Sequence, residues 1–300
     1  MPIRTRTDEI IVIVLARWER HLLTILFLAA YLLVLVQVLW TMPIPGKPGW
    51  PCAVLLVLAA GTTVAALARH LPLQNILFVV ILIGFAGGAV TWLDMKTGIP
   101  FGPFIIGDDL GPKLPVLTWK NITGNHPFTV VGNLGARLRH TVPWSLPVIW
   151  IVAVLNSRGV ARLILRPWRK IHSFGFWLIG LTVCLTVIFD IALDPFASRA
   201  KHYWTWGPTK FPLSWQGAPL VNFFSWAIVA LLILAFVSPL LIRKQPHKRL
   251  PPDFHPLGVW LGGVLLFGAG AASAGLWSAA ALDGIIGVVV ATFAIRGARW

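Results

Sequence analysis

Long apolar runs separated by polar segments dominate the sequence. Eight runs approach the roughly 20 residues that a helix needs to cross the hydrocarbon core of a membrane. The fourth is the shortest and carries Pro143 and Pro147, so a tilted, extended or partly re-entrant segment is an alternative there. The pattern predicts an all-α, polytopic integral membrane helix bundle. Its expected spans are about 21–40, 51–69, 72–93, 142–156, 174–193, 219–242, 257–276 and 279–295.

The composition agrees with this class, because 57% of the residues are hydrophobic and only 12% are charged. No soluble domain stands out, so residues 1–300 are predicted to form a single transmembrane domain. A net charge of +15 would suit a nucleic-acid binder if the basic residues gathered on one soluble face. Here they fall between the apolar runs, which is how membrane topology is encoded, and no nucleic-acid partner is expected.

The basic residues also predict the orientation of the bundle. With the N-terminus inside, the inner segments hold about two thirds of the 25 Lys and Arg residues, and cytoplasmic loops are enriched in such residues. The densest inner groups are Arg158–Lys170 and Arg243–Arg249. Both termini are therefore predicted to be cytoplasmic.

Two carboxylates, Asp190 and Asp194, close the fifth apolar run one helical turn apart. Asn222 and Trp226 open the sixth run, again four residues apart and so on one helix face. A carboxylate at hydrocarbon depth costs roughly 2.5–3.5 kcal/mol on insertion scales, so such residues are functional candidates. The tryptophan-rich linker between these runs and the loop Trp92–Leu114 emerge on the same predicted outer side. A site between these two segments is therefore expected.

Five motifs on these segments occur in the order TGIPFGPF, DDLGPKL, LDP, YWTW and GAPLVNFFSW. Together they resemble the membrane carotenoid hydratase family, which includes the bisanhydrobacterioruberin and γ-carotene 1′,2′-hydratases, over roughly residues 80–240. The chain departs from that family at Phe104 and Ile106, where tyrosines are expected, and in an outer-loop insertion of about residues 116–141. Asp94 is the carboxylate nearest to the acidic position expected before the Thr-Gly pair. The resemblance implies a bacterial or archaeal cytoplasmic membrane location.

The implied reaction adds water to the terminal 1′,2′ double bond of an acyclic (ψ) carotenoid end. It needs a proton for the less substituted carbon, a transient cation on the tertiary carbon and a water that attacks there. A carboxylic acid, a group that orients water and aromatic faces beside the cation supply these needs, and no cofactor is required. The implied partners are a long-chain carotenoid and membrane lipid.

We assign roles on this basis as a hypothesis. Asp108 is the proton donor and Asp190 the alternative acid, while Asp194 and Asn222 orient the water. The aromatic residues expected to bind the substrate are Trp204, Trp206, Trp226, Phe101, Phe104, Phe223 and Tyr203. Structural interpretations stand beside these roles, since tryptophans also form belts at membrane headgroups and Asn222 can bond across helices.

Other polar residues receive weaker or different assignments. His202, beside the YWTW motif, is a candidate proton shuttle, and Asp283 is expected to cap the last helix. No two histidines lie three or four residues apart, which disfavours di-iron hydroxylases and desaturases, and no metal site is predicted. The alternative from another functional class is a non-catalytic membrane protein that binds or transports a carotenoid or other lipid.

Overall fold

The computed structural model describes residues 6–40, 49–107, 142–208, 213–242 and 252–300, with side chains from residue 22 onward. In these ranges, eight helices are long and apolar enough to cross a membrane, which confirms the predicted helix bundle. They are α1 (Arg6–Trp40), α2 (Trp50–Leu67), α3 (Leu73–Thr97), α6 (Ser145–Ile164), α7 (Phe174–Asp194), α8 (Leu220–Val237), α9 (His255–Ser273) and α10 (Trp277–Ala298). The short elements are β1 (Phe104–Ile106), β2 (Trp204–Trp206), β3 (Ser214–Trp215), β4 (Ala218–Pro219), η2 (Arg166–Trp168), η3 (Pro195–Ala200) and η4 (Ser238–Leu241).

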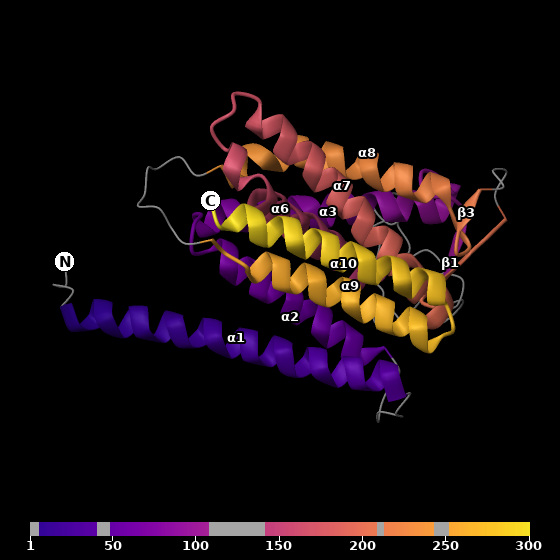
Figure 1. Cartoon of the computed structure of the whole chain (residues 1–300), viewed down its shortest axis with the longest axis horizontal. Helices are drawn as coiled ribbons and strands as arrows, with labels where there is room; N and C mark the ends of the chain where they lie inside the picture. Colours follow the sequence, from indigo (N-terminus) through magenta and orange to yellow (C-terminus); the bar gives the residue numbers. More distant parts are fainter. Residues whose placement is uncertain (1–5, 41–48, 108–141, 209–212, 243–251) are drawn as a thin grey trace, which may run out of the picture.

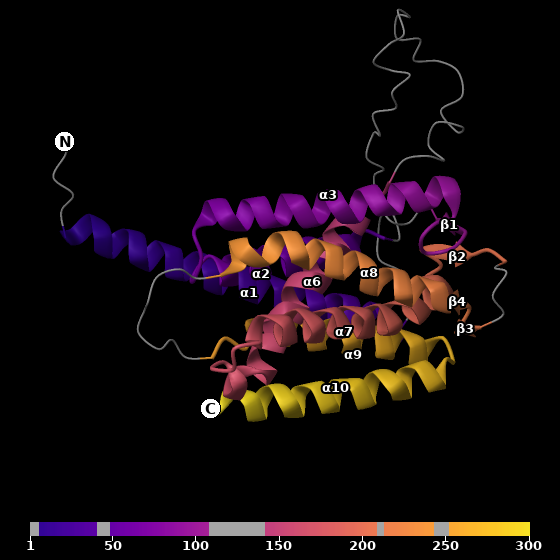
Figure 2. The same cartoon turned by 90° about the horizontal axis from the view of Figure 1, so that it is seen from above.

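The long helices lie side by side, with the first residues of α1 and the end of α10 at one end of the bundle (Figure 1). The short strands lie at the opposite end, which we call the strand end (Figure 2). An even number of spans returns the chain to its starting side, as the charge pattern requires. The placement of that side in the cytoplasm stays a prediction.

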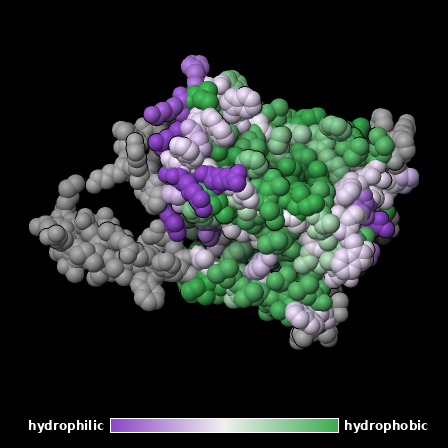
Figure 3. Space-filling model, in the orientation of Figure 1, coloured by the Kyte–Doolittle hydropathy of each residue, from purple (hydrophilic) through white to green (hydrophobic). Residues whose placement is uncertain are grey.

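The surface between the two ends is apolar. Figure 3 shows a broad hydrophobic band across the middle of the molecule, with hydrophilic residues gathered near the end that carries the C-terminus. Large apolar side chains are open to the surroundings, among them Phe85, Phe176 and Phe224, whose exposed fractions are 76%, 83% and 70%. A water-soluble protein would rarely expose so large an apolar surface, whereas lipid covers it without cost.

Helix α6 corrects the prediction for the fourth span. It begins at Ser145, so that Pro143 precedes it and Pro147 lies in its first turn, where a missing N–H group is tolerated. It is also the most enclosed span, with 67% of its most apolar stretch buried, against 17% for α1. The expected segment, 142–156, was too short.

The polar residues at the end of that expected segment explain the error. Asn156 Nδ2 donates to Thr63 Oγ1 at 3.0 Å, and the buried Arg158 donates to the Leu241 carbonyl at 3.3 Å. These side chains are satisfied inside the bundle, so the helix continues to Ile164 past residues that hydropathy scores as a boundary.

Asp283 does not cap the last helix, contrary to the prediction. Helix α10 begins at Trp277, more than one turn earlier, and Asp283 lies within it at 1% exposure, against Gly268 of α9. Its Oδ2 atom has no hydrogen-bond partner among the described residues. The expected start at residue 279 placed Asp283 too close to the helix end.

Candidate active site

Two segments that are far apart in the sequence pair at the strand end of the bundle. Strand β1 follows α3 and strand β2 follows α7, and they run antiparallel with Phe104 opposite Trp206. The N–H of Gly207 donates to the Pro103 carbonyl at 2.7 Å and extends the pairing. The structure thus places the Gly-Pro-Phe loop and the tryptophan-rich linker side by side, as the predicted topology requires.

Asp94 shapes the turn that follows α3. The helix ends at Thr97, and Gly98 adopts a left-handed φ of 69° that an ordinary side chain would strain. Asp94 Oδ1 accepts the backbone N–H groups of Phe101 at 2.7 Å and Gly102 at 3.3 Å. These bonds fold the loop back over the helix end and bury Phe101 at 4% exposure. Asp94 therefore positions a wall of the site, a role that the sequence reading did not assign to it.

Asp190, Asp194 and Asn222 form a buried polar cluster between α7 and α8. Asn222 Nδ2 lies 2.8 Å from Asp190 Oδ2 and 3.3 Å from Asp194 Oδ2. All three side chains are at most 2% exposed. One amide group therefore bridges both carboxyl groups, which holds them on the same side of α7.

The two carboxyl groups have different hydrogen-bond partners. Asp194 Oδ1 accepts the indole N–H groups of Trp204 at 2.9 Å and Trp206 at 3.0 Å, in addition to the bond from Asn222 at Oδ2. Asp190 accepts only the Asn222 bond among the described residues. Three N–H donors suit a carboxylate that acts purely as an acceptor.

A pocket of about 480 Å³ opens beside Asp190, and we call it the acid pocket. Its walls come from α3, α6, α7, α8, β1 and β2 and include Asn222. The rings of Trp150 and Trp226 stack in it with centroids 3.8 Å apart and planes at 13°. Each aromatic face can stabilise a nearby cation by about 0.5–2 kcal/mol. The aromatic residues that line it are Phe101, Phe104, Trp150, Trp204, Trp206 and Trp226.

Among the residues that it describes, the structure brings most of the predicted site residues together, with three exceptions. Phe223 is buried but lies outside the wall of the acid pocket, and Tyr203 lines a neighbouring apolar pocket instead. His202 is exposed, which leaves no geometric support for a proton shuttle. Asp108 lies outside the described residues.

Trp150 and Thr91 line the acid pocket but were not predicted. Trp150 lies in the fourth apolar run, where no motif or polar neighbour marks it. Asp94 was noted for its position before the Thr-Gly pair, and this was the signal that could have identified it as a positioning residue.

The donor set of the cluster does not suit a metal ion. Two carboxylates one turn apart can bind Mg²⁺ through their oxygens. Here the oxygens of Asp194 face N–H groups, which would repel a cation. The part of the chain that the structure describes contains no group of three or more His, Cys, Asp or Glu side chains able to hold a metal.

A membrane-spanning helix bundle that encloses a carboxyl pair among aromatic rings defines an integral membrane protein with a site for a largely apolar ligand. The family follows from comparison: residues 123–290 match the model of the carotenoid biosynthesis protein family. This match covers more than half of the chain and includes Asp190, Asp194 and Asn222, so the protein belongs to that family. Membership supports a role in carotenoid biosynthesis. Searches of curated proteins and of solved structures give no match.

Proposed function

We propose that this protein is a cofactor-independent carotenoid hydratase that adds water across the terminal 1′,2′ double bond of a ψ end. The observation that carries the proposal is the buried Asp190–Asn222–Asp194 cluster, which opens onto a pocket walled by six aromatic rings. Family membership supports a carotenoid as the substrate. The cluster provides an acid and polar groups for water in a wall that is otherwise mainly aromatic and aliphatic.

In the proposed reaction, Asp190 donates its proton to C2′, the less substituted carbon. The electron pair of the double bond forms the new C–H bond and leaves a tertiary cation at C1′, which the aromatic rings stabilise. Water attacks C1′ and passes a proton back to the Asp190 carboxylate. The acid is regenerated, and the net change is the addition of one water without oxidation or reduction.

Two features favour Asp190 over Asp194 as the acid. Asp190 lines the pocket and accepts a single N–H bond, so it can carry a proton and present it to the substrate. Asp194, with three N–H donors, serves as the ionised partner that orients Asn222, Trp204 and the attacking water.

Expression in a host that makes lycopene or γ-carotene tests the proposal. The wild-type protein is expected to yield a more polar carotenoid that is heavier by one water. Asp190→Asn is expected to lower the product about 100-fold or more, because general acids contribute roughly 10²–10⁴ in rate. Chromatography with mass spectrometry gives the product, and an immunoblot of the membrane fraction shows that the variant is inserted.

Asp108→Asn separates the two candidate acids. With Asp190 as the acid, this variant is expected to keep making product. Loss of product in Asp108→Asn together with full product in Asp190→Asn would move the acid role to Asp108.

The second candidate function is carotenoid or lipid binding without catalysis. Phe104 and Ile106 favour it, because they stand where the resembling family has tyrosine hydroxyl groups. Unchanged pigment that copurifies with the wild-type protein would support this candidate and contradict hydration.

A further inference from the structure

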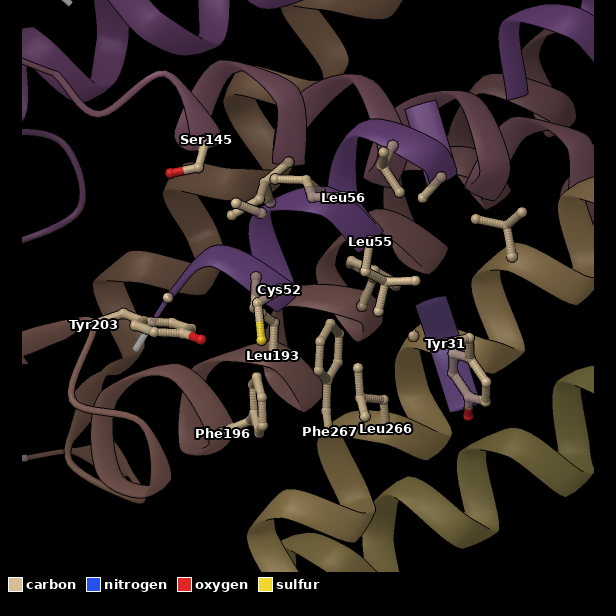
Figure 4. A pocket seen from close by; sticks show the side chains of 18 of the residues that line it. Tyr31, Cys52, Leu55, Leu56, Ser145, Leu193, Phe196, Tyr203, Leu266 and Phe267 are labelled. Atoms are coloured by element: carbon tan, nitrogen blue, oxygen red, sulfur yellow. The ribbon is translucent and has the colours of Figure 1, made fainter. Parts of the chain in front are cut away.

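A second and larger pocket lies between α1, α2, α6, α7 and α9, and we call it the apolar pocket (Figure 4). The empty space within it and at its opening is about 920 Å³. Its wall is formed mainly by aliphatic and aromatic side chains, such as Leu55, Leu56, Phe196 and Phe267. Among the residues that the structure describes, no Asp, Glu, Lys, Arg or His side chain lines it. A polar or charged ligand would lose its hydration there without gaining charged partners.

The apolar pocket adjoins the acid pocket. Ile149, Leu193 and Trp204 line both of them. Trp204 is 7% exposed, and its indole N–H is held by Asp194 at 2.9 Å. The carboxyl cluster therefore fixes the orientation of a ring that separates the two pockets.

The apolar pocket runs along the helices rather than across them. On α2 its wall extends from Gly49 to Ala59, which is roughly 15 Å at the rise of an α-helix. Ser145 and Tyr203 line the pocket near the strand end. Val259 lines it near the start of α9, away from the strand end. An occupant would thus extend from the acid pocket toward the middle of the membrane.

We propose that the apolar pocket holds the polyene chain of the substrate next to its reacting end, with that end in the acid pocket and Trp204 at the boundary. The proposal rests on the proposed function for the identity of the reacting end. Chain binding itself is independent of the reaction. The three shared wall residues, the uncharged lining of the apolar pocket and the position of both pockets among the spans fit one long apolar molecule that occupies both pockets.

Neighbouring residues on α2 supply a matched pair of variants. Leu56 lines the apolar pocket, whereas Val57 is 51% exposed on the outside of the bundle. Leu56→Trp is expected to fill the pocket, and Val57→Trp adds a similar bulk that faces lipid.

The two cysteines give a second pair, because Cys52 lines the pocket and Cys184 is exposed. Cys52→Trp and Cys184→Trp are therefore the same substitution inside and outside the pocket.

Each variant is made in the full-length Asp190→Asn protein, expressed in a lycopene-producing host and purified in mild detergent. The measurement is the amount of lycopene that copurifies per protein, read from its visible absorbance. We expect the two pocket variants to retain several-fold less lycopene than their matched controls. Equal retention within both pairs overturns the proposal, and the second pair keeps the test decisive if one pocket variant fails to insert.

The same four substitutions in the otherwise wild-type chain separate this proposal from the proposed function. If every variant makes hydrated product and all retain lycopene equally, the proposed hydratase function stands and the apolar pocket is not the binding site of the chain. If lycopene retention depends on Leu56 and Cys52 but the wild type makes no hydrated product, the binding site stands and the proposed hydration is wrong.

Discussion

Trp204 and Trp206 act through their indole N–H groups as well as their rings. Tryptophans near a membrane border commonly direct their N–H groups toward headgroups. Here both N–H groups bond to the buried Asp194 at 2.9 and 3.0 Å. These two tryptophans are therefore part of the carboxyl cluster and not only members of an aromatic belt.

Removal of one of these N–H groups should slow product formation more than removal of an indole N–H group elsewhere. Trp206→Phe keeps an aromatic ring but deletes a donor to Asp194, and hydrogen bonds to charged groups contribute about 1.5–3 kcal/mol. Since 1.4 kcal/mol corresponds to about tenfold, we expect hydrated product to form at least about tenfold more slowly. Initial rates of product formation in membranes measure this.

Trp215→Phe is the control for that experiment. The Trp215 N–H donates to the Ile191 carbonyl at 3.3 Å and not to the carboxyl pair, so this variant should keep most of its activity. Equal losses in the two variants would show that the indole–carboxyl bond has no special role.

The sequence identified the polar members of the site better than its aromatic members. Asp190, Asp194 and Asn222 are conspicuous because polar residues are rare in apolar runs and because their spacing places them on facing helix sides. Trp150 could not be found in this way, because the residues three and four positions from it on the same helix face are all apolar. The partnership of Asp94 with Phe101 depends on a loop conformation that the sequence pattern does not predict.

Among the elements, α3 and α6 pack closely at the site. A Cβ atom added to Gly87 of α3 would collide with the ring of Trp150 on α6. The ring of Trp150 in turn stacks on Trp226 of α8. Because residue 87 is a glycine, the ring of Trp150 fits against α3 and stacks on Trp226, which joins the three helices α3, α6 and α8.

Gly87→Ala tests the importance of this packing. A helical Gly→Ala change without steric conflict is stabilising by about 1 kcal/mol, whereas overpacking costs about 1–3 kcal/mol. We expect Gly87→Ala to lower the thermal unfolding temperature in detergent and to reduce hydrated product, because Trp150 must move. Gly180→Ala on α7 is the control, since no described atom beyond its own stretch of helix lies within 4 Å of its added Cβ. Unchanged stability in both variants would contradict the close α3–α6 packing.

The element boundaries were predictable where apolar runs end at Pro, Gly or charged residues. The second and sixth spans illustrate this, with bounds at Trp50–Leu67 and Leu220–Leu241. The third span begins at Leu73, after Pro72, as predicted, but it continues past Asp94 to Thr97 instead of ending at residue 93. The fourth span was not, because Asn156 and Arg158 are buried and bonded within the bundle, and hydropathy cannot distinguish such residues from a solvated helix end.

At the scale of the whole molecule, the orientation in the membrane can be tested directly. The charge pattern predicts that the end with both termini faces the cytoplasm and the strand end faces outward. A green fluorescent protein fused after Trp300 should therefore fluoresce, and alkaline phosphatase at the same position should be inactive. Alkaline phosphatase inserted after Pro208, at the strand end, should be active. The reverse result would place the acid pocket on the cytoplasmic side.

The location of the carboxyl cluster determines how a carotenoid and water, which do not mix, would both reach it. Asp194 is the last residue of α7, and Asn222 lies in the first turn of α8, so the cluster lies near the strand end of both helices. A carotenoid chain would enter from the surrounding lipid, whereas water would enter from the strand end of the bundle. The proposed hydration would therefore need no water channel through the whole protein, and it would leave the more polar end of the product at the strand end.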